Sequence, residues 1–198
     1  MNYLAHLLLA GAADTDRLGA LMGDFVKGPL PGALNADLAA GVMLHRRIDS
    51  FADAHPAFHR SRCRISAQRR RYGGILVDMF YDHLLARHWQ HFHDQDLADF
   101  AREAYALLRR HEALLPVQLA GMLPAMEAGD WLASYGDTLA LALALERMSR
   151  HRLRSPNPLA NGEEELQADA PGFEADFLEF LPAAMDFSAR LRQGREAA

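Results

Sequence analysis

Two carboxylates lie four residues apart in a segment that is otherwise almost entirely apolar. Residues 75–89 read ILVDMFYDHLLARHW, and on a helix Asp78 and Asp82 share one face with Leu85 and Trp89. Burying carboxylates on such a helix is costly unless they are paired, hydrogen-bonded or bound to a cation. A divalent metal would offset both the burial and the mutual repulsion of the two acids. Two interpretations stay open here, a metal or catalytic site and a structural network paired with arginines.

A second segment shows the same change from apolar to ionisable residues. Residues 36–54 (ADLAAGVMLHRRIDSFADA) predict a helix that Asn35 caps and that ends before Pro56. Its apolar row continues into His45 and Asp49, one helical turn apart. We therefore expect an imidazole and a carboxylate on the buried face of this helix.

Further polar residues that face inward lie on two short predicted helices near the N-terminus. His6 lies among leucines in residues 4–11, and Asp24 lies in the last turns of a helix predicted over residues 14–28. A carboxylate there opposes the helix dipole, so another contact must explain Asp24. The whole inward-facing set is His6, Asp24, His45, Asp49, Asp78, Asp82 and His83. Imidazole with carboxylate suits Mn²⁺, Fe²⁺ or Zn²⁺, and a set dominated by carboxylates favours Mn²⁺ or Mg²⁺.

Arginines cluster in the same half of the chain. Residues 46–71 hold eight arginines against two aspartates, whereas residues 161–180 hold seven acids and no lysine or arginine. Arg46 and Arg47 follow His45 directly and would hold a phosphate beside the metal, or else form a surface pair. The remaining arginines predict a docking face for an acidic macromolecule, with a solvated helix face as the alternative. They are Arg60, Arg62, Arg64, Arg69, Arg70 and Arg71.

The elements that must position these residues are all predicted to be helices. Apolar residues recur at helical spacing throughout, and no run of alternating β-branched residues suggests a strand. Pro124 should limit a helix that begins near Val117, and Gly136 should divide residues 131–150. We expect an all-α fold, a single-domain bundle of about seven to nine helices over residues 1–198. Its site helices would lie in residues 1–93, and its scaffold and acidic C-terminal helices in residues 94–198.

Composition narrows the class of protein. The chain has 198 residues and a net charge of −5, which disfavours a general nucleic-acid binder. The single Cys63 cannot form an internal disulfide and indicates a reducing, cytoplasmic setting. The longest apolar run, residues 139–145, is too short to cross a membrane.

Four motifs in order resemble the bacterial acyl carrier protein phosphodiesterases, also called acyl carrier protein hydrolases. They are NYLAH (residues 2–6), GDFVKG (23–28), HRRID (45–49) and VDMFYDHLLARHW (77–89). This family is similar to a divergent branch of the HD-domain metal phosphohydrolases, so the resemblance implies an HD-domain-like helical fold. It also implies hydrolysis of the phosphodiester that joins 4′-phosphopantetheine to the serine of holo acyl carrier protein, through water activated by Mn²⁺.

The resemblance also implies roles for individual residues. The metal set would be His6, Asp24, Asp78 and Asp82, with His45, Arg46, Arg47, Asp49 and His83 in catalysis. His83 or His45 would protonate the departing serine oxygen. The adjacent His-Asp pair of the HD superfamily is missing, and Asp82-His83 has the reverse order, so that superfamily's ligands do not transfer directly.

Two other functions fit the same residues. The first is a metal phosphohydrolase that acts on a nucleotide or another small phosphoester, for which the arginine cluster would not matter. The second is a helical adaptor without enzymatic activity, whose basic face binds an acidic partner and whose buried acids are structural. Dependence of activity on a divalent metal would separate the adaptor from both enzymes.

Overall fold

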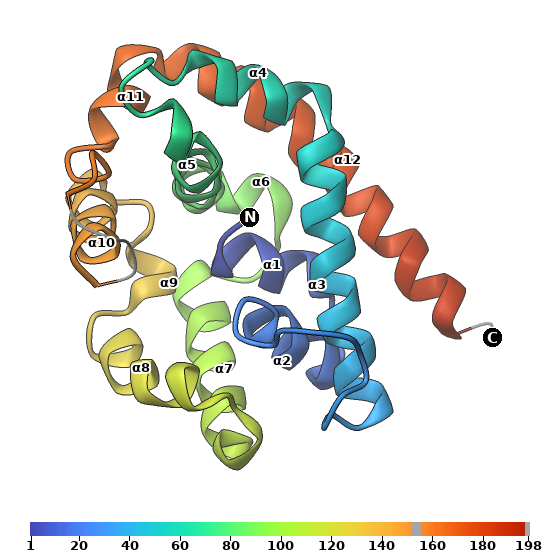
Figure 1. Cartoon of the computed structure of the whole chain (residues 1–198). Helices are drawn as coiled ribbons and strands as arrows, with labels where there is room; N and C mark the ends of the chain where they lie inside the picture. The colour runs from blue at the N-terminus through green and yellow to red at the C-terminus, as the bar shows by residue number, and fades with distance from the viewer. Residues whose placement is uncertain (152–155, 197–198) are drawn as a thin grey trace.

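The computed structural model describes residues 1–151 and 156–196, and over them it confirms the predicted all-α, single-domain fold (Figure 1). Those residues form twelve α-helices, nine of them longer than six residues, and two short 3₁₀ turns. The helices are α1 (Tyr3–Ala10), α2 (Asp14–Met22), α3 (Ala36–Ala54), α4 (Pro56–Arg64), α5 (Gly73–Arg87), α6 (Trp89–Phe92), α7 (Leu97–Arg110), α8 (Val117–Ala128), α9 (Trp131–Ser134), α10 (Thr138–His151), α11 (Glu163–Ala168) and α12 (Ala170–Glu196). None of them is both long and apolar enough to span a bilayer.

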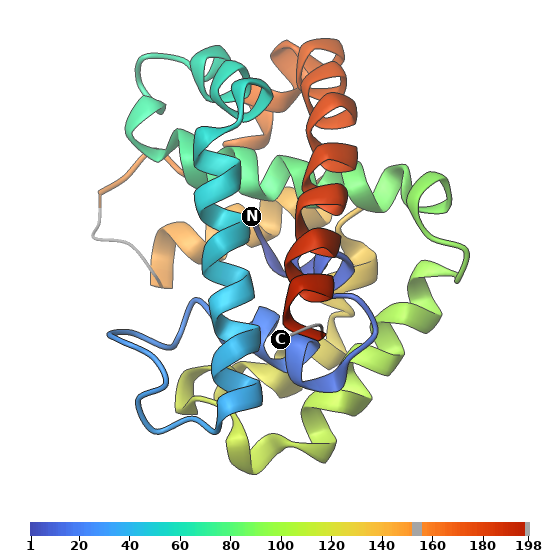
Figure 2. The same ribbon diagram turned by 90° about the vertical axis from the view of Figure 1, so that its right-hand side faces the viewer.

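Helix α1 lies at the centre of the bundle. It packs against α2, α3, α5 and α12, and seven of its eight residues are buried. Figure 2 shows α3 and α12 running side by side along one face, with α5 crossing behind them. Phe173, Phe177 and Phe180 of α12 are fully buried, so this helix contributes aromatic side chains to the core. The central position of α1 places His6 in the interior.

Helices α2 and α3 make the closest contact in the fold. Gly19 and Gly41 face each other there, and a Cβ atom added to Gly19 would lie 2.3 Å from the carbonyl carbon of Gly41. Only a residue without a side chain allows the two backbones to approach so closely. Helix α3 begins as predicted, because Oδ1 of Asn35 accepts the backbone N–H of Leu38 at 2.9 Å.

Two local predictions about helix ends are wrong. Helix α2 ends at Met22, so Asp24 lies in the turn beyond the helix. Pro124 does not end its helix, since α8 continues around it to Ala128. The predicted break near Gly136 is confirmed, because α9 ends at Ser134 and α10 begins at Thr138.

The arginine-rich helix α4 meets the acidic C-terminal helices within the chain. Arg60 and Arg64 each donate to Asp176, which is 2% exposed, at 2.7 and 2.8 Å. Arg60 also pairs with Glu179, and Arg64 with Asp169. Arg69 contacts Glu164 and Glu165 of α11 and donates to the carbonyl of Pro158.

This pairing corrects the predicted docking face. Arg60, Arg64 and Arg69 are neutralised by the acidic segment of the same chain, because α4 packs along α12. Burial of Asp176 makes these contacts structural, since an unpaired carboxylate there would be costly. Arg62, Arg70 and Arg71 remain exposed.

The α2–α3 contact predicts the effect of a single methyl group. Gly19→Ala places a Cβ against immobile backbone, so we expect a loss of about 3 kcal/mol in the free energy of unfolding, measured by urea denaturation. The matched control is Gly121→Ala on α8, where the added Cβ meets nothing within 4 Å. That change should raise stability by about 1 kcal/mol, because alanine favours a helix. Equal effects of the two substitutions would contradict the close packing.

Candidate active site

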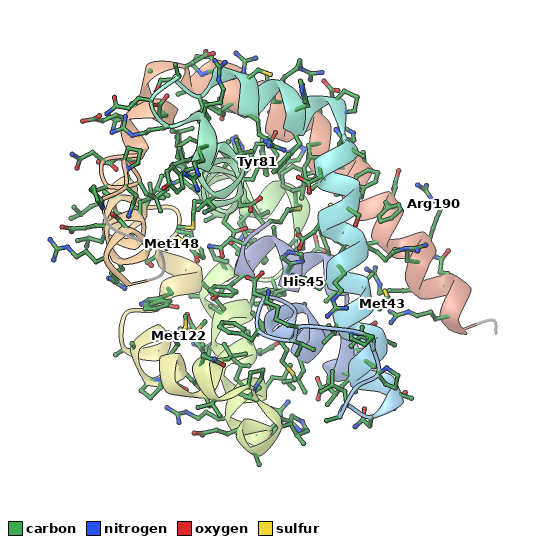
Figure 3. The ribbon with its side chains drawn as sticks, viewed as in Figure 1. Met43, His45, Tyr81, Met122, Met148 and Arg190 are labelled. Atoms are coloured by element: carbon green, nitrogen blue, oxygen red, sulfur yellow. The ribbon has the colours of Figure 1, made fainter. Side chains whose placement is uncertain are left out.

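Two stacked histidine rings form the centre of the site. The ring centroids of His6 and His45 lie 3.8 Å apart at 14°, and the two residues are 1% and 3% exposed. Asp49 bridges them, with Oδ1 3.0 Å from Nε2 of His6 and Oδ2 3.1 Å from Nε2 of His45. In Figure 3, His45 lies on the inner side of α3, toward α1. His45 and Asp49, which were predicted to share one face of α3, thus both contact His6 of α1.

The last turn of α2 and the residues that follow it hold the ring of His45 in place. The Nδ1–H of His45 donates to the carbonyl of Ala20 at 2.8 Å, which turns Nε2 of the same ring toward Asp49 and Asp24. Oδ1 of Asp24 lies 3.7 Å from that nitrogen. A Cβ atom on Gly23 would come within 2.2 Å of the ring, so the GDFVKG motif needs its first glycine for this contact. The position of Asp24, unexplained by its predicted helix, follows from its contact with His45.

The two imidazoles carry different charges at neutral pH. Burial lowers the pKa of His6 to about 4, and the positive charge of His45 adds to that effect. Burial also disfavours charge on His45, but hydrogen bonds to Asp24 and Asp49 outweigh it and raise the pKa of His45 to about 9. Burial alone would raise the pKa of Asp49, yet its bonds to both rings hold that pKa well below its usual range. His45 is therefore the charged ring and His6 the neutral one.

A cavity of about 510 Å³ opens beside these rings. Asp24, Asp49 and Asp78 line it, and Oδ1 of Asp78 lies 3.0 Å from the α-amino nitrogen of Met1. The same ammonium group lies 3.1 Å from Asp49. Burial raises the pKa of Asp78, although the Met1 ammonium opposes the shift. The cavity therefore joins carboxylates from three segments of the chain, and Asp53 of α3 is a fourth in its lining.

The donor atoms in this cluster fit a divalent metal. One ligand atom each of His6, His45 and Asp49 lies within 4.8 Å of the others. The second nitrogen of His6, Nδ1, is buried and has no hydrogen-bond partner among the described residues. The N–H of His45 that donates to a backbone carbonyl matches the support that metal-bound histidines usually have. Two imidazoles and a carboxylate suit Mn²⁺, Fe²⁺ or Zn²⁺.

Asp82 has a role beyond the predicted one. Its two oxygens accept the backbone N–H groups of Leu4 and Ala5 at 2.8 and 3.1 Å, and it is 0% exposed. Burial raises the pKa of Asp82 to about 7, while the two N–H groups lower it. Both oxygens satisfy the first turn of α1, a role that the sequence did not predict, and the role of Asp82 as a metal ligand stays a prediction. Asp82 acts on the site by holding the helix that carries His6.

Three predicted catalytic residues lie outside both the cavity lining and the cluster of His6, His45 and Asp49. Nδ1 of His83 faces the carbonyl of Tyr135 at 2.8 Å. Arg46 donates to the carbonyls of Val26 and Gly28, so it braces the loop after α2. Arg47 is exposed and makes no side-chain hydrogen bond or ion pair within the described part of the chain. The structure thus gives no geometric support to the phosphate-binding role of the arginine pair or to the acid role of His83, and both stay predictions.

Two other residues reach the site without having been predicted. Asn2 lines the cavity, and its Nδ2 donates to the hydroxyl of Tyr135 at 2.7 Å. Gly23 makes room for the His45 ring. Both lie inside the motifs NYLAH and GDFVKG, next to residues that were predicted. The ionisable residues of the site all come from residues 1–93, while Met148 and Leu159 add apolar lining from the rest of the chain.

The family model for acyl carrier protein phosphodiesterase matches residues 1–184. The chain belongs to this family. A relative from Serratia proteamaculans named acyl carrier protein phosphodiesterase is 33% identical over 186 residues, covering 93% of this chain and 96% of its own. Relatives of the same name from Pectobacterium atrosepticum and Escherichia coli are 34% and 30% identical, covering 95% and 96% of this chain and 97% and 98% of theirs. No solved structure gives a significant match. The further link to HD-domain proteins stays a prediction.

The role of Asp82 can be tested by changing its charge alone. Asp82→Asn sets an amide N–H against a backbone N–H of α1, so we expect a loss of about 2 kcal/mol in the free energy of unfolding. Urea denaturation at pH 8, where the carboxyl group is mostly ionised, measures this loss. The control is Asp186→Asn, an exposed position on α12, with an expected change within about 0.5 kcal/mol. An unchanged midpoint for Asp82→Asn would remove the assigned role.

Proposed function

We propose that this protein hydrolyses the phosphodiester between 4′-phosphopantetheine and the serine of holo acyl carrier protein. The products are apo carrier protein and 4′-phosphopantetheine. The observation that carries the proposal is the cluster of His6, His45 and Asp49 beside a cavity that Asp49 lines, in a chain that belongs to the acyl carrier protein phosphodiesterase family. The single exposed Cys63 suits a reducing compartment, so the proposed location is the cytoplasm.

The proposed cofactor is a divalent metal, with Mn²⁺ as the first choice. His6, His45 and Asp49 would hold it, and Asp24 lies next to them. When bound, such an ion supplies an activated water and offsets the negative charge of the phosphoryl group. Its affinity should fall at low pH, because His45 must lose its proton to become a ligand.

The protein's own groups would prepare the cavity for a phosphodiester. Ala20 fixes the orientation of His45, and Asp49 fixes both rings at once. Asp78 lies in the cavity wall beside them, where its raised pKa suits a carboxyl group that takes up and releases a proton. We assign to Asp78 the protonation of the departing serine oxygen, because His83 lies outside the cavity lining.

The metal-dependent hydrolysis is tested with holo acyl carrier protein and mass spectrometry. The purified protein, treated with chelator and resupplied with Mn²⁺, should remove the mass of 4′-phosphopantetheine from the carrier. Asp49→Asn should lower kcat by about 10²-fold or more, because it removes the carboxylate shared by the two histidines. Asp37→Asn, an exposed change on the same helix, should keep the activity. An unchanged carrier mass with metal-loaded, folded protein would overturn the proposal.

An acidic carrier would approach over the arginines that the fold leaves exposed. Arg62 pairs only loosely with Asp53, at 3.6 Å, and Asp53 lines the cavity. Arg70 and Arg71 lie in the turn directly before Gly74, which lines the cavity as well. These three cations form the proposed docking surface, and complementary charge would raise the rate of encounter.

The docking surface predicts a salt-dependent effect on KM. Reversing Arg70 and Arg71 together to glutamate should raise KM for holo carrier at least about tenfold at low salt, and the effect should shrink as salt screens the charges. Hydrolysis of bis(p-nitrophenyl) phosphate should stay the same, since this small diester needs no docking surface. The control is Arg190→Glu, on the outer side of α12 (Figure 3). An enzyme for nucleotides would instead show no change with either variant.

A further inference from the structure

A second cavity, of about 370 Å³, lies between α8, α9, α10 and the start of the chain. Its walls are mostly apolar and include Met122, Trp131, Leu143 and Ala144. Figure 3 shows Met122 and Met148 on the α8 and α10 side of the molecule, across from His45. Cavities that bind small molecules commonly have this character and a volume of roughly 300–1,000 Å³. The phosphodiester site described above does not use these walls.

The second cavity borders the acidic one directly. Asn2, Met79 and Met148 line both, so the two cavities lie on either side of the same three side chains. Nδ2 of Asn2 lies 2.9 Å from the sulfur of Met79. Methionine is unbranched and flexible, so this boundary can adapt to a chain that passes from one cavity to the other. The acidic cavity and the apolar one therefore adjoin each other at these three side chains.

Only a few polar groups interrupt the apolar walls. Ser134 and the amide of Asn2 lie at one end, and Arg147 lies over the ring of Trp131 at 5.2 Å. Leu143 is 41% exposed and lies at the rim of the cavity. A ligand that suits these walls is mainly aliphatic, with isolated groups that can form hydrogen bonds.

We propose that the second cavity is the subsite for the pantetheine arm of the substrate. This inference rests on the proposed function, which places the phosphodiester beside Asp49 and Asp78. The carrier protein is too large to enter either cavity, so it must stay outside, on the side of Arg70 and Arg71. The arm on the other side of the phosphorus then extends past Met79 and Met148. Its dimethyl and methylene groups match the apolar walls, and its two amides match Asn2 and Ser134.

Binding of pantetheine without its phosphate tests this subsite independently of turnover. Trp131 lines the cavity, whereas Trp89 is 2% exposed and donates to the carbonyl of Gln95, so only Trp131 should respond. We expect saturable quenching of tryptophan fluorescence by reduced pantetheine, and loss of that signal in Trp131→Phe. Absence of quenching, or a response to octanoate but not to pantetheine, would overturn the proposal. Failure of the hydrolysis assay alone would refute the proposed function and leave this readout intact.

A variant that fills the second cavity tests whether pantetheine binding there determines the preference for holo carrier over a small diester. Ala144→Phe should raise the Kd for pantetheine and the KM for holo carrier about tenfold or more, while hydrolysis of bis(p-nitrophenyl) phosphate stays unchanged. Leu143→Ser, at the exposed rim, is a gentler change that should act in the same direction with little risk to folding. The control is Leu139→Ser, which is 65% exposed one turn earlier on α10 and outside the cavity. An equal loss on both substrates in folded variants would contradict the subsite.

Discussion

The organisation of this protein depends on the balance of charge among three carboxylates that meet beside one cavity. Asp24, Asp49 and Asp78 come from three segments and would repel one another without compensation. The charged ring of His45 and the ammonium group of Met1 supply it. A cluster of carboxylates favours cations, so the charges that constrain the fold here also support the proposed metal site.

Close backbone contacts and buried hydrogen bonds hold the helices around the cluster of His6, His45 and Asp49 in fixed positions. The glycine contact between α2 and α3 brings the turn that holds Asp24 against His45. Asp82 anchors the first turn of α1 and thereby sets the position of His6. Asp82, which the sequence predicts as a metal ligand, thus supports the helix that carries His6. Because His6 lies on α1 whereas His45 and Asp49 lie on α3, a small shift between these two helices would separate the cluster.

The arginines of residues 60–71 fall into two groups, one that pairs with acids of the same chain and one that stays exposed near the cavity. Those that face α11 and α12 are bound to the acidic segment of the same chain, so they hold α4 in place. Those near the cavity, Arg62, Arg70 and Arg71, keep their charge at the surface. The net charge of −5 is therefore compatible with a local basic face. An acidic cavity, an adjoining apolar cavity and this basic face match the three parts of a carrier-linked phosphodiester.

Local patterns in the sequence determined the helices and the chemistry they carry. Helical spacing predicted that His45 and Asp49 lie one turn apart on a buried face, and the cap at Asn35 was correct, because both depend on neighbours within a few residues. The motifs also indicated the family. Only the tertiary structure decided which donors meet, that Asp82 supports α1, and that Arg60 and Arg64 pair with Asp176. These contacts join residues far apart in sequence, and their partners depend on how whole helices pack, which no local spacing encodes.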